Sequence, residues 1–272
     1  MITLGIFDSG VGGLSVLRDV QNQLPTVPCV YVADNAFAPY GEREVETIQE
    51  RTQKITAYLR EHWQINALII ACNTATAHAI DGLRASHPDL HIIGVEPALK
   101  PAALFSTSGH IGVLATRRTL SSERYQRLQR QVEMQSRRPA NFWPQACDGL
   151  ANAIENNQTE EIEVLCKRYA TSMFNAGPGA NHIDTVVLGC THYPFAVEAL
   201  QAASQRSTVR FMDTGLPVAK RTRELLAPLM TAPLNDGPAL LPTLLSTGDA
   251  EGLGRAAQRW INPLLHAHSI DV

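Results

Sequence analysis

Ile69-Ile-Ala-Cys-Asn-Thr74 and Val187-Leu-Gly-Cys-Thr-His192 share one pattern: an apolar run, a small residue, a cysteine and then hydrogen-bonding side chains. Earlier in each half, Gly5-Ile-Phe-Asp-Ser-Gly10 and Gly112-Val-Leu-Ala-Thr116 are apolar runs that also end in polar groups. Runs that are apolar on both faces are typical of strands in a parallel sheet covered by helices. Strand ends in α/β proteins often look alike, but we interpret the repetition as an internal duplication that predicts two similar α/β lobes.

Short apolar segments alternate with helical patterns along the chain, which predicts an α/β fold with parallel sheets. The strand candidates are residues 2–7, 29–33, 67–71, 91–95, 110–115, 142–146, 185–189 and 209–212. Helical patterns cover residues 42–61, 121–135 and 159–174, with serines at 121 and 122 and Thr159 as N-cap candidates. We expect two Rossmann-like or flavodoxin-like lobes, related by a pseudo-two-fold axis, with the active site in the cleft between them. The first lobe takes residues 1–97 and 209–272, and the second takes residues 98–208.

Composition and charge exclude several classes of protein. The chain has 26 acids, 23 bases, a net charge of −3 and no long basic run, so nucleic acid is not an expected partner. No positively charged segment precedes Asp8, and no apolar stretch approaches the roughly 20 residues that span a bilayer. We therefore expect a cytoplasmic protein that does not enter a membrane. The sequence leaves the oligomeric state open, and surface helices allow a homodimer.

Neither a metal nor a cofactor is expected. The five cysteines are widely spaced and contain no Cys-x-x-Cys, so a disulfide framework or a structural zinc site is not indicated. His266 and His268 have no carboxylate or cysteine cluster beside them. No lysine stands in a context that suggests a Schiff base with a cofactor.

The polar residues that close the predicted strands are the candidates for chemistry, because ligands bind outside the carboxyl ends of parallel strands. Cys72 and Cys190 would stand on two sides of a cleft, one thiolate removing a proton from carbon while the other thiol returns one to the opposite face. That is the geometry racemisation needs. The alternative for each cysteine is a small core residue. Asp8 is expected to orient or deprotonate Cys72, or to cap the following helix, and His192 to serve Cys190, or to lie in a surface turn.

The glycine run Asp8-Ser-Gly-Val-Gly-Gly13 resembles a phosphate loop but lacks the required Lys-Ser/Thr. Ser15 also stands where the dinucleotide fingerprint has its third glycine, so nucleotide binding is not expected. Its backbone N–H groups suit a substrate carboxylate, and tight strand–helix packing is the alternative. Pro39-Tyr-Gly41 is expected either to reach the same cleft or to form a plain turn.

Six motifs, in order along the chain, resemble the glutamate racemases of the aspartate/glutamate racemase superfamily. They are Phe7-Asp-Ser-Gly-Val-Gly-Gly-Leu-Ser-Val16, Pro39-Tyr-Gly41, Ala71-Cys-Asn-Thr-Ala75, Gly94-Val-Glu-Pro-Ala98, Gly112-Val-Leu-Ala-Thr116 with Thr119, and Leu188-Gly-Cys-Thr-His-Tyr-Pro194. The resemblance covers residues 7 to about 215. It implies a two-lobed enzyme that interconverts L- and D-glutamate for peptidoglycan, without pyridoxal phosphate or metal.

The resemblance also implies roles for individual residues. Cys72 and Cys190 match the catalytic acid/base pair, with Asp8 assisting the first and His192 the second. The positions that match substrate-binding residues are Ser9, Tyr40, Gly41, Asn73, Thr74, Thr116, Thr119 and Thr191. An assisting glutamate aligns with Glu155, eight residues after Cys147, but the intervening Asp148-Gly-Leu-Ala-Asn-Ala departs from the family's prolines and aliphatics. The alternative for Glu155 is an exposed acid at a helix end.

Two other functions fit the same sequence. The first keeps the fold and changes the substrate: a racemase of aspartate or a related diacid, or an isomerase or decarboxylase of the superfamily. The second is an amino-acid binding or sensing protein with a ligand in the cleft. Such a binder has no use for the paired cysteines.

Overall fold

The computed structural model describes residues 2–136, 138–229 and 237–272 and divides the chain into two compact units. One unit is Met1–Val95 with Gly215–Val272, and the other is Glu96–Thr214. The sequence pattern predicted residues 96–97 and 209–214 as part of the first lobe, but both stretches lie in the second unit. For residues 209–214 the reason is that β8 (Arg210–Met212) pairs with β7 (Thr185–Gly189) in that unit's sheet.

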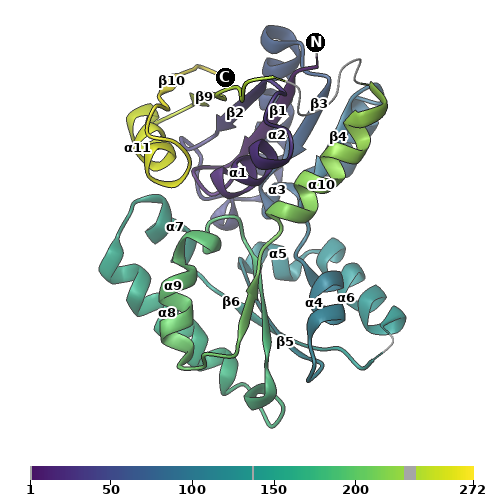
Figure 1. Ribbon diagram of the computed structural model, residues 1–272, viewed down its shortest axis with the longest axis vertical. Coiled ribbons are helices and arrows are strands. Elements are labelled where there is room, and N and C mark those ends of the chain that lie inside the picture. The colour runs from purple at the N-terminus through teal and green to yellow at the C-terminus, as the bar shows by residue number, and fades with distance from the viewer. Residues whose placement is uncertain (1, 137, 230–236) are drawn as a thin grey trace. The chain divides into compact units, whose positions relative to one another are not determined.

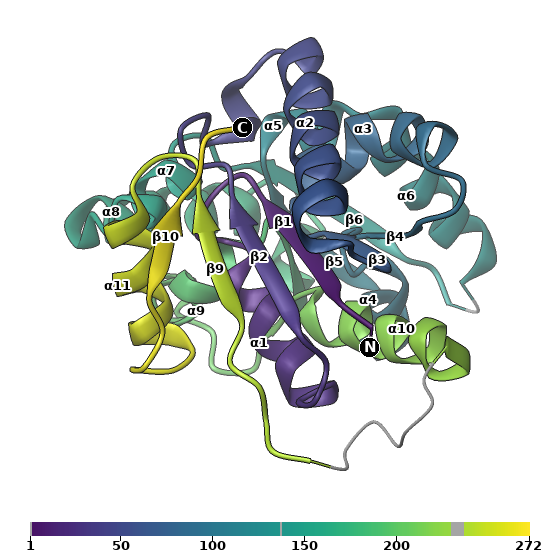
Figure 2. The same ribbon diagram turned by 90° about the horizontal axis from the view of Figure 1, so that it is seen from above.

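The first unit contains a six-stranded parallel sheet in the order β10-β9-β2-β1-β3-β4 (Figure 2). Its strands are β1 (Leu4–Asp8), β2 (Cys29–Ala33), β3 (Ala67–Ile70), β4 (His91–Gly94), β9 (Thr243–Ser246) and β10 (Ala267–Ser269). Every residue of β1, β2 and β3 is buried, whereas the edge strands β4 and β10 are partly exposed. The central strands are therefore the ones that read as apolar on both faces.

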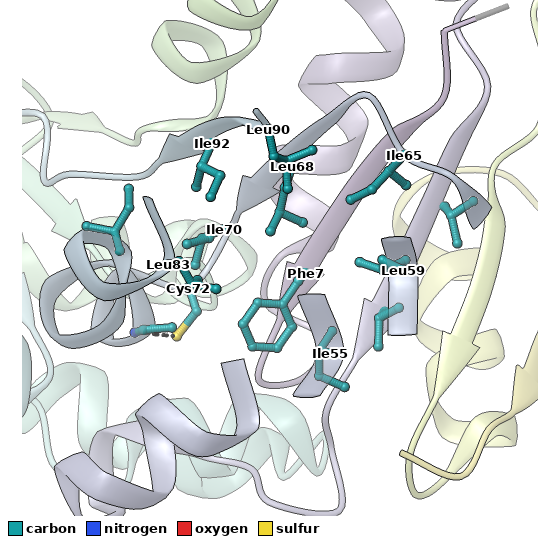
Figure 3. Packing of buried hydrophobic residues seen from close by; sticks show 14 of the residues in the cluster. Phe7, Ile55, Leu59, Ile65, Leu68, Ile70, Cys72, Leu83, Leu90 and Ile92 are labelled. Atoms are coloured by element: carbon teal, nitrogen blue, oxygen red, sulfur yellow. Dashed lines mark hydrogen bonds between the residues drawn. The ribbon is translucent and has the colours of Figure 1, made fainter. Parts of the chain in front are cut away.

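Helices cover both faces of this sheet. They are α1 (Leu14–Gln23), α2 (Val45–Trp63), α3 (Asn73–Ser86), α10 (Gly215–Leu226) and α11 (Ala250–Trp260), with a 3-10 turn η1 (Tyr40–Glu42) before α2 and η4 (Ala227–Leu229) after α10. α2 packs with α3 on one face, and α1 packs with α10 and α11 on the other (Figure 2). Under α2 and α3 lies a core that includes Phe7, Leu59, Ile70 and Leu83 (Figure 3).

The second unit contains a four-stranded parallel sheet in the order β6-β5-β7-β8. β5 is His110–Ala115 and β6 is Asn141–Ala146, an edge strand that accommodates Pro144 because a strand edge needs no N–H there. The helices are α4 (Leu99–Phe105), α5 (Arg117–Ser121), α6 (Glu123–Gln135), α7 (Leu150–Glu155), α8 (Thr159–Phe174) and α9 (Val197–Ser204), with 3-10 turns η2 (Ala180–His182) and η3 (Tyr193–Ala196). α4 packs with α6, and α8 packs with α7 and α9 across the sheet from them (Figure 1).

The two sheets repeat one topology, as the duplication predicts. β2-β1-β3-β4 in the first unit corresponds to β6-β5-β7-β8 in the second. The helix that follows the fourth strand of each set packs in the other unit: α4 follows β4 but packs on α6, and α10 follows β8 but packs on α1. The α/β class with two parallel sheets is confirmed, while the pseudo-two-fold axis and the cleft stay predictions.

Several local predictions differ from the structure. β9 and β10 were not predicted. Ser122 caps α6 by accepting a hydrogen bond from the Tyr125 backbone N–H, but Ser121 ends α5. Thr159 is the first residue of α8 rather than its cap, and Asp8 does not cap α1, whose N-cap is Gly13 without a side-chain bond. Within the described ranges, no helix is both long and apolar enough to cross a bilayer.

Candidate active site

Cys72 lies just beyond the carboxyl end of β3, at the N-cap of α3. Its side chain stands at the margin of the first unit's core, and Sγ accepts a hydrogen bond of 3.4 Å from the backbone N–H of Ala75 (Figure 3). A helix N-terminus carries partial positive charge, which favours a thiolate over a thiol. The local structure therefore supports the reactive interpretation of Cys72, although the residue is only 6% exposed.

A hydrogen-bonded path leads from Cys72 to the buried carboxylate of Asp8. Cys72 Sγ donates to Ser9 Oγ at 3.7 Å, and Ser9 Oγ donates to Asp8 Oδ1 at 3.1 Å. Gly13 leaves room for this carboxylate, because a Cβ at position 13 would lie 2.7 Å from Asp8 Oδ2. The expected link between Asp8 and Cys72 thus includes Ser9, which the resemblance assigned to substrate binding.

Tyr40 lies in the same core cluster as Cys72 and is fixed by a buried carboxylate. Its hydroxyl donates to Asp34 Oδ2 at 2.6 Å, and Arg51 binds both oxygens of Asp34 at 2.9 and 2.8 Å. Burial, Asp34 and Cys72 raise the pKa of Tyr40, and Arg51 offsets this only in part. Tyr40 is therefore a neutral phenol whose orientation is held by an ion pair.

Asn73 and Thr74 open α3 directly after Cys72, and both are buried. In the described part of the chain, neither the amide nitrogen nor the amide oxygen of Asn73 has a hydrogen-bond partner. A buried amide without partners is costly, and a bound ligand is one way to satisfy it. Gly41, in η1, is the remaining expected binding residue of this unit.

In the second unit, Cys190, His192 and Glu155 form a continuous chain of contacts. Cys190 follows β7, and its Sγ lies 3.7 Å from His192 Nδ1. His192 Nε2 lies 2.6 Å from Glu155 Oε2, with side-chain exposures of 3% and 11%. The histidine is therefore not in a surface turn, and the glutamate is not an exposed helix-end acid.

The protonation of His192 follows from its two partners. Burial lowers its pKa, but hydrogen bonds and negative charge from Cys190 and Glu155 outweigh burial and raise the pKa well above its usual value. Because a carboxylate only accepts hydrogen bonds, Nε2 carries a proton toward Glu155. A second proton on Nδ1 would face Cys190 Sγ. The contact can thus shift between thiol–imidazole and thiolate–imidazolium along one hydrogen bond.

Three further expected binding residues lie in the second unit. Thr116 caps α5, its Oγ1 donating to Thr119 Oγ1 at 3.0 Å and accepting from the Thr119 N–H at 3.2 Å. Thr119 and Thr191 are buried, and Thr191 directly follows Cys190. Within the ranges that the structure covers, no group of three or more His, Cys, Asp and Glu side chains is arranged to hold a metal ion.

Sequence reasoning missed the residues that support these side chains. Asp34 closes β2, so the rule about polar strand ends could have found it. Arg51 lies among many charged residues of α2, and nothing in the local pattern distinguishes it. Tyr193 is part of a quoted motif, but its bond to the Cys147 carbonyl joins residues far apart in sequence.

Each of the two α/β units contains a parallel sheet and a cysteine just beyond its third strand, which is the arrangement expected of an α/β enzyme with polar groups at the carboxyl ends of its strands. The chain belongs to the Asp/Glu/Hydantoin racemase family, whose model matches residues 7–219. Among its relatives are glutamate racemases. That of Stutzerimonas stutzeri is 42% identical over 226 residues, covering 82% of this chain and 81% of the relative. That of Pseudomonas aeruginosa (strain UCBPP-PA14) is 39% identical over 254 residues, covering 93% and 91%.

Solved structures of glutamate racemases share the fold. The Escherichia coli enzyme, in complex with L-glutamate and the activator UDP-MurNAc-ala, has a TM-score of 0.83 and 30% identity over 100% of this chain and 98% of that one. The Bacillus anthracis isoform RacE1 has a TM-score of 0.82 and 27% identity, covering 100% and 97%. The chain is thus similar over its whole length to amino-acid racemases.

Proposed function

We propose that this protein is a glutamate racemase, which interconverts L- and D-glutamate and supplies D-glutamate for peptidoglycan. The observation that carries the proposal is the pair of cysteines at equivalent strand ends, each with its own proton-handling partners. The full-length similarity to glutamate racemases supports glutamate as the substrate. A racemase of aspartate or a related diacid is the alternative, and a comparison of kcat/KM for the two amino acids decides between them.

In the proposed reaction, one proton is removed from Cα and another is added to its opposite face. One of Cys72 and Cys190 acts as a thiolate and removes the α-proton of L-glutamate, while the other, as a thiol, protonates the opposite face of Cα. The roles reverse for D-glutamate. Ser9 and Asp8 would relay the proton of Cys72, and His192 with Glu155 that of Cys190. His192 as imidazolium stabilises the Cys190 thiolate, because opposite charges at hydrogen-bond distance favour each other.

The proposed substrate-binding set consists of polar residues that the family resemblance indicates. The unpartnered amide of Asn73 can bind the α-carboxylate or α-ammonium group. Ser9, Tyr40, Gly41 and Thr74 from the first unit and Thr116, Thr119 and Thr191 from the second complete the proposed set. An Asn73→Ala variant is expected to raise KM for glutamate more than it lowers kcat.

The experiment follows the α-hydrogen in D₂O. Early in the reaction, we expect deuterium at Cα of the product enantiomer while the recovered substrate keeps its hydrogen, because different groups remove and return the proton. Cys72→Ala and Cys190→Ala should each lower kcat by about 100-fold or more, the range for loss of a general acid or base. Cys166→Ala is the matched control, since Cys166 is a buried thiol of α8 whose pKa burial raises to about 12.

Full activity in either Cys72→Ala or Cys190→Ala would contradict the two-thiol mechanism. Tight glutamate binding without exchange at Cα would favour a binding protein instead. The cytoplasmic location and the homodimer stay predictions, and light scattering of the purified protein tests the second. Activation, which a relative shows with UDP-MurNAc-ala, is tested by adding that compound to the assay.

A further inference from the structure

Glu155 reaches His192 from the end of the short helix α7, in which Leu150, Ala151, Ala153 and Ile154 are buried. α7 has six residues, its N-cap Gly149 makes no side-chain bond, and Gly149 adopts a left-handed conformation with φ of +81°. A helix this short is unstable on its own. α7 packs on α8, but beside it a hollow of about 890 Å³ is lined by Asn152, Thr159 and Glu160 among others. Hydrogen bonds at the turn before α7 therefore add to the packing that positions Glu155.

Two tyrosine hydroxyls provide such anchors at the turn before α7. Tyr193 donates to the carbonyl oxygen of Cys147 at 3.3 Å, and Tyr169 of α8 donates to the carbonyl oxygen of Asp148. Both rings are buried, at 0% and 8% exposure. They bind two consecutive carbonyls just ahead of Gly149, the N-cap residue of α7.

Tyr193 also directly follows His192, which closes a ring of contacts. From His192 the ring runs to Tyr193, across the hydrogen bond to Cys147, along α7 to Glu155, and back to His192 Nε2 at 2.6 Å. The hydrogen bond between Tyr193 and Cys147 therefore connects the segment that carries His192 to the turn that leads to Glu155. A displacement of the turn changes the distance between them directly.

We propose that Tyr169 and Tyr193, here named the tyrosine clamp, are positioning residues that hold α7 so that Glu155 stays hydrogen-bonded to His192. The kinetic part of this inference rests on the proposed function, and the spectroscopic part does not. The two clamp hydroxyls bind backbone carbonyl oxygens rather than the reacting sulfur, and their effect reaches the site through Glu155 and His192.

The test compares Tyr193→Phe and Tyr169→Phe with Tyr125→Phe. Tyr125 is the matched control because its hydroxyl is buried in the same unit without a hydrogen-bond partner among the described residues. In the clamp variants, kcat should fall about two- to tenfold, as loss of one hydrogen bond predicts, with KM nearly unchanged. In a Glu155→Gln background the same substitutions should lower kcat by less than about twofold.

NMR titration of the His192 ring, assigned by its absence in His192→Gln, gives a readout that needs no turnover. When Glu155 moves away, the imidazolium loses a stabilising carboxylate, so the midpoint should shift to lower pH in both clamp variants and stay unchanged in Tyr125→Phe. Circular dichroism checks folding, and if Tyr193→Phe does not fold, Tyr169→Phe decides.

The clamp is refuted if the His192 midpoint matches wild type in folded clamp variants, or shifts equally in Tyr125→Phe. The clamp would also be refuted if Tyr193→Phe and Tyr169→Phe lowered kcat in the Glu155→Gln background by the same factor as in the wild-type protein. A protein without racemase activity whose midpoint still shifts would count against the proposed function and not against the clamp.

Discussion

Asp34 illustrates how much one buried carboxylate can organise. It is 0% exposed and accepts hydrogen bonds from Tyr40, from two nitrogens of Arg51 and from Thr247 Oγ1 at 2.8 Å. Arg51 also stacks over the Phe37 ring, 4.1 Å from its centroid. A buried ion pair of this kind adds little stability relative to an apolar pair, but removing one partner leaves an uncompensated charge. Its contribution here is the fixed orientation of Tyr40.

Arg51→Met tests this at the residue scale. Leaving Asp34 buried without its guanidinium should destabilise the protein by about 3–5 kcal/mol, measured by urea unfolding. Lys54→Met on the same helix is the control, because Lys54 and its partner Glu50 have exposed side chains and water already screens the pair. Equal losses in the two variants would show that the buried network is unimportant.

Individual helices and turns show where backbone geometry constrains the sequence. Gly109, between α4 and β5, has φ of +71°, and a Cβ there would lie 2.3 Å from the Pro139 carbonyl oxygen. Gly82 lies inside α3 with no atom within 4 Å of its would-be Cβ. The same residue type therefore serves two elements differently: one turn requires it, and one helix is weakened by it.

Alanine substitutions should separate these two glycines. Gly82→Ala is expected to stabilise the protein by about 0.5–1 kcal/mol, since alanine loses less backbone entropy in a helix. Gly109→Ala is expected to destabilise it by at least about 1–3 kcal/mol, the strain of a left-handed alanine before any clash is counted. Urea unfolding midpoints check both, and shifts of the same sign would contradict the argument.

At the scale of the whole molecule, the proposed reactive groups and the structural hydrogen bonds lie at opposite ends of the strands in both sheets. Cys72 and Cys190 follow the carboxyl ends of β3 and β7. At the amino ends, Asn66 Oδ1 accepts from the Thr3 N–H at 2.9 Å, and Asp184 precedes β7. Parallel strands place all their carboxyl ends on one edge, so reactive groups can gather there while the other edge is closed by structural hydrogen bonds.

Asp184 makes the stability of the protein depend on pH in the acidic range. Burial opposes its ionisation, but hydrogen bonds from Ser106, Ser108, Thr107 and Thr185 outweigh burial and hold its pKa well below its usual range. A folded pKa below the unfolded value of about 3.9 gives stability that is complete above that pH. The stability is lost as the pH falls from there through the folded value.

We therefore expect the free energy of unfolding of Asp184→Asn to depend less on pH in the acidic range than that of the wild-type protein. Unfolding free energies measured in urea should fall less steeply in the variant as the pH decreases from about 5 to about 2. The slope should be smaller by up to the value that corresponds to the uptake of one proton on unfolding. Asp89→Asn should change the slope less, because Asp89 pairs with Arg60 at an exposed site. A slope unchanged by Asp184→Asn would rule out this carboxylate as the source.

The sequence by itself determined the α/β class, the ranges of β2, β5 and β7, and the two cysteine motifs. These features are encoded locally, because buried parallel strands and the polar residues that close them are consecutive in the chain. β9 and the edge strand β10 are short and only partly apolar, so local pattern did not reveal them.

Only the tertiary structure decided which side chains work together. His192 meets Glu155 across 37 positions, Tyr193 meets Cys147 across 46, and Arg51 meets Asp34 across 17. Contacts of this kind depend on how helices pack on the sheets, and no run of neighbouring residues records that packing. The same holds for Ser9, which tertiary structure inserts between Cys72 and Asp8.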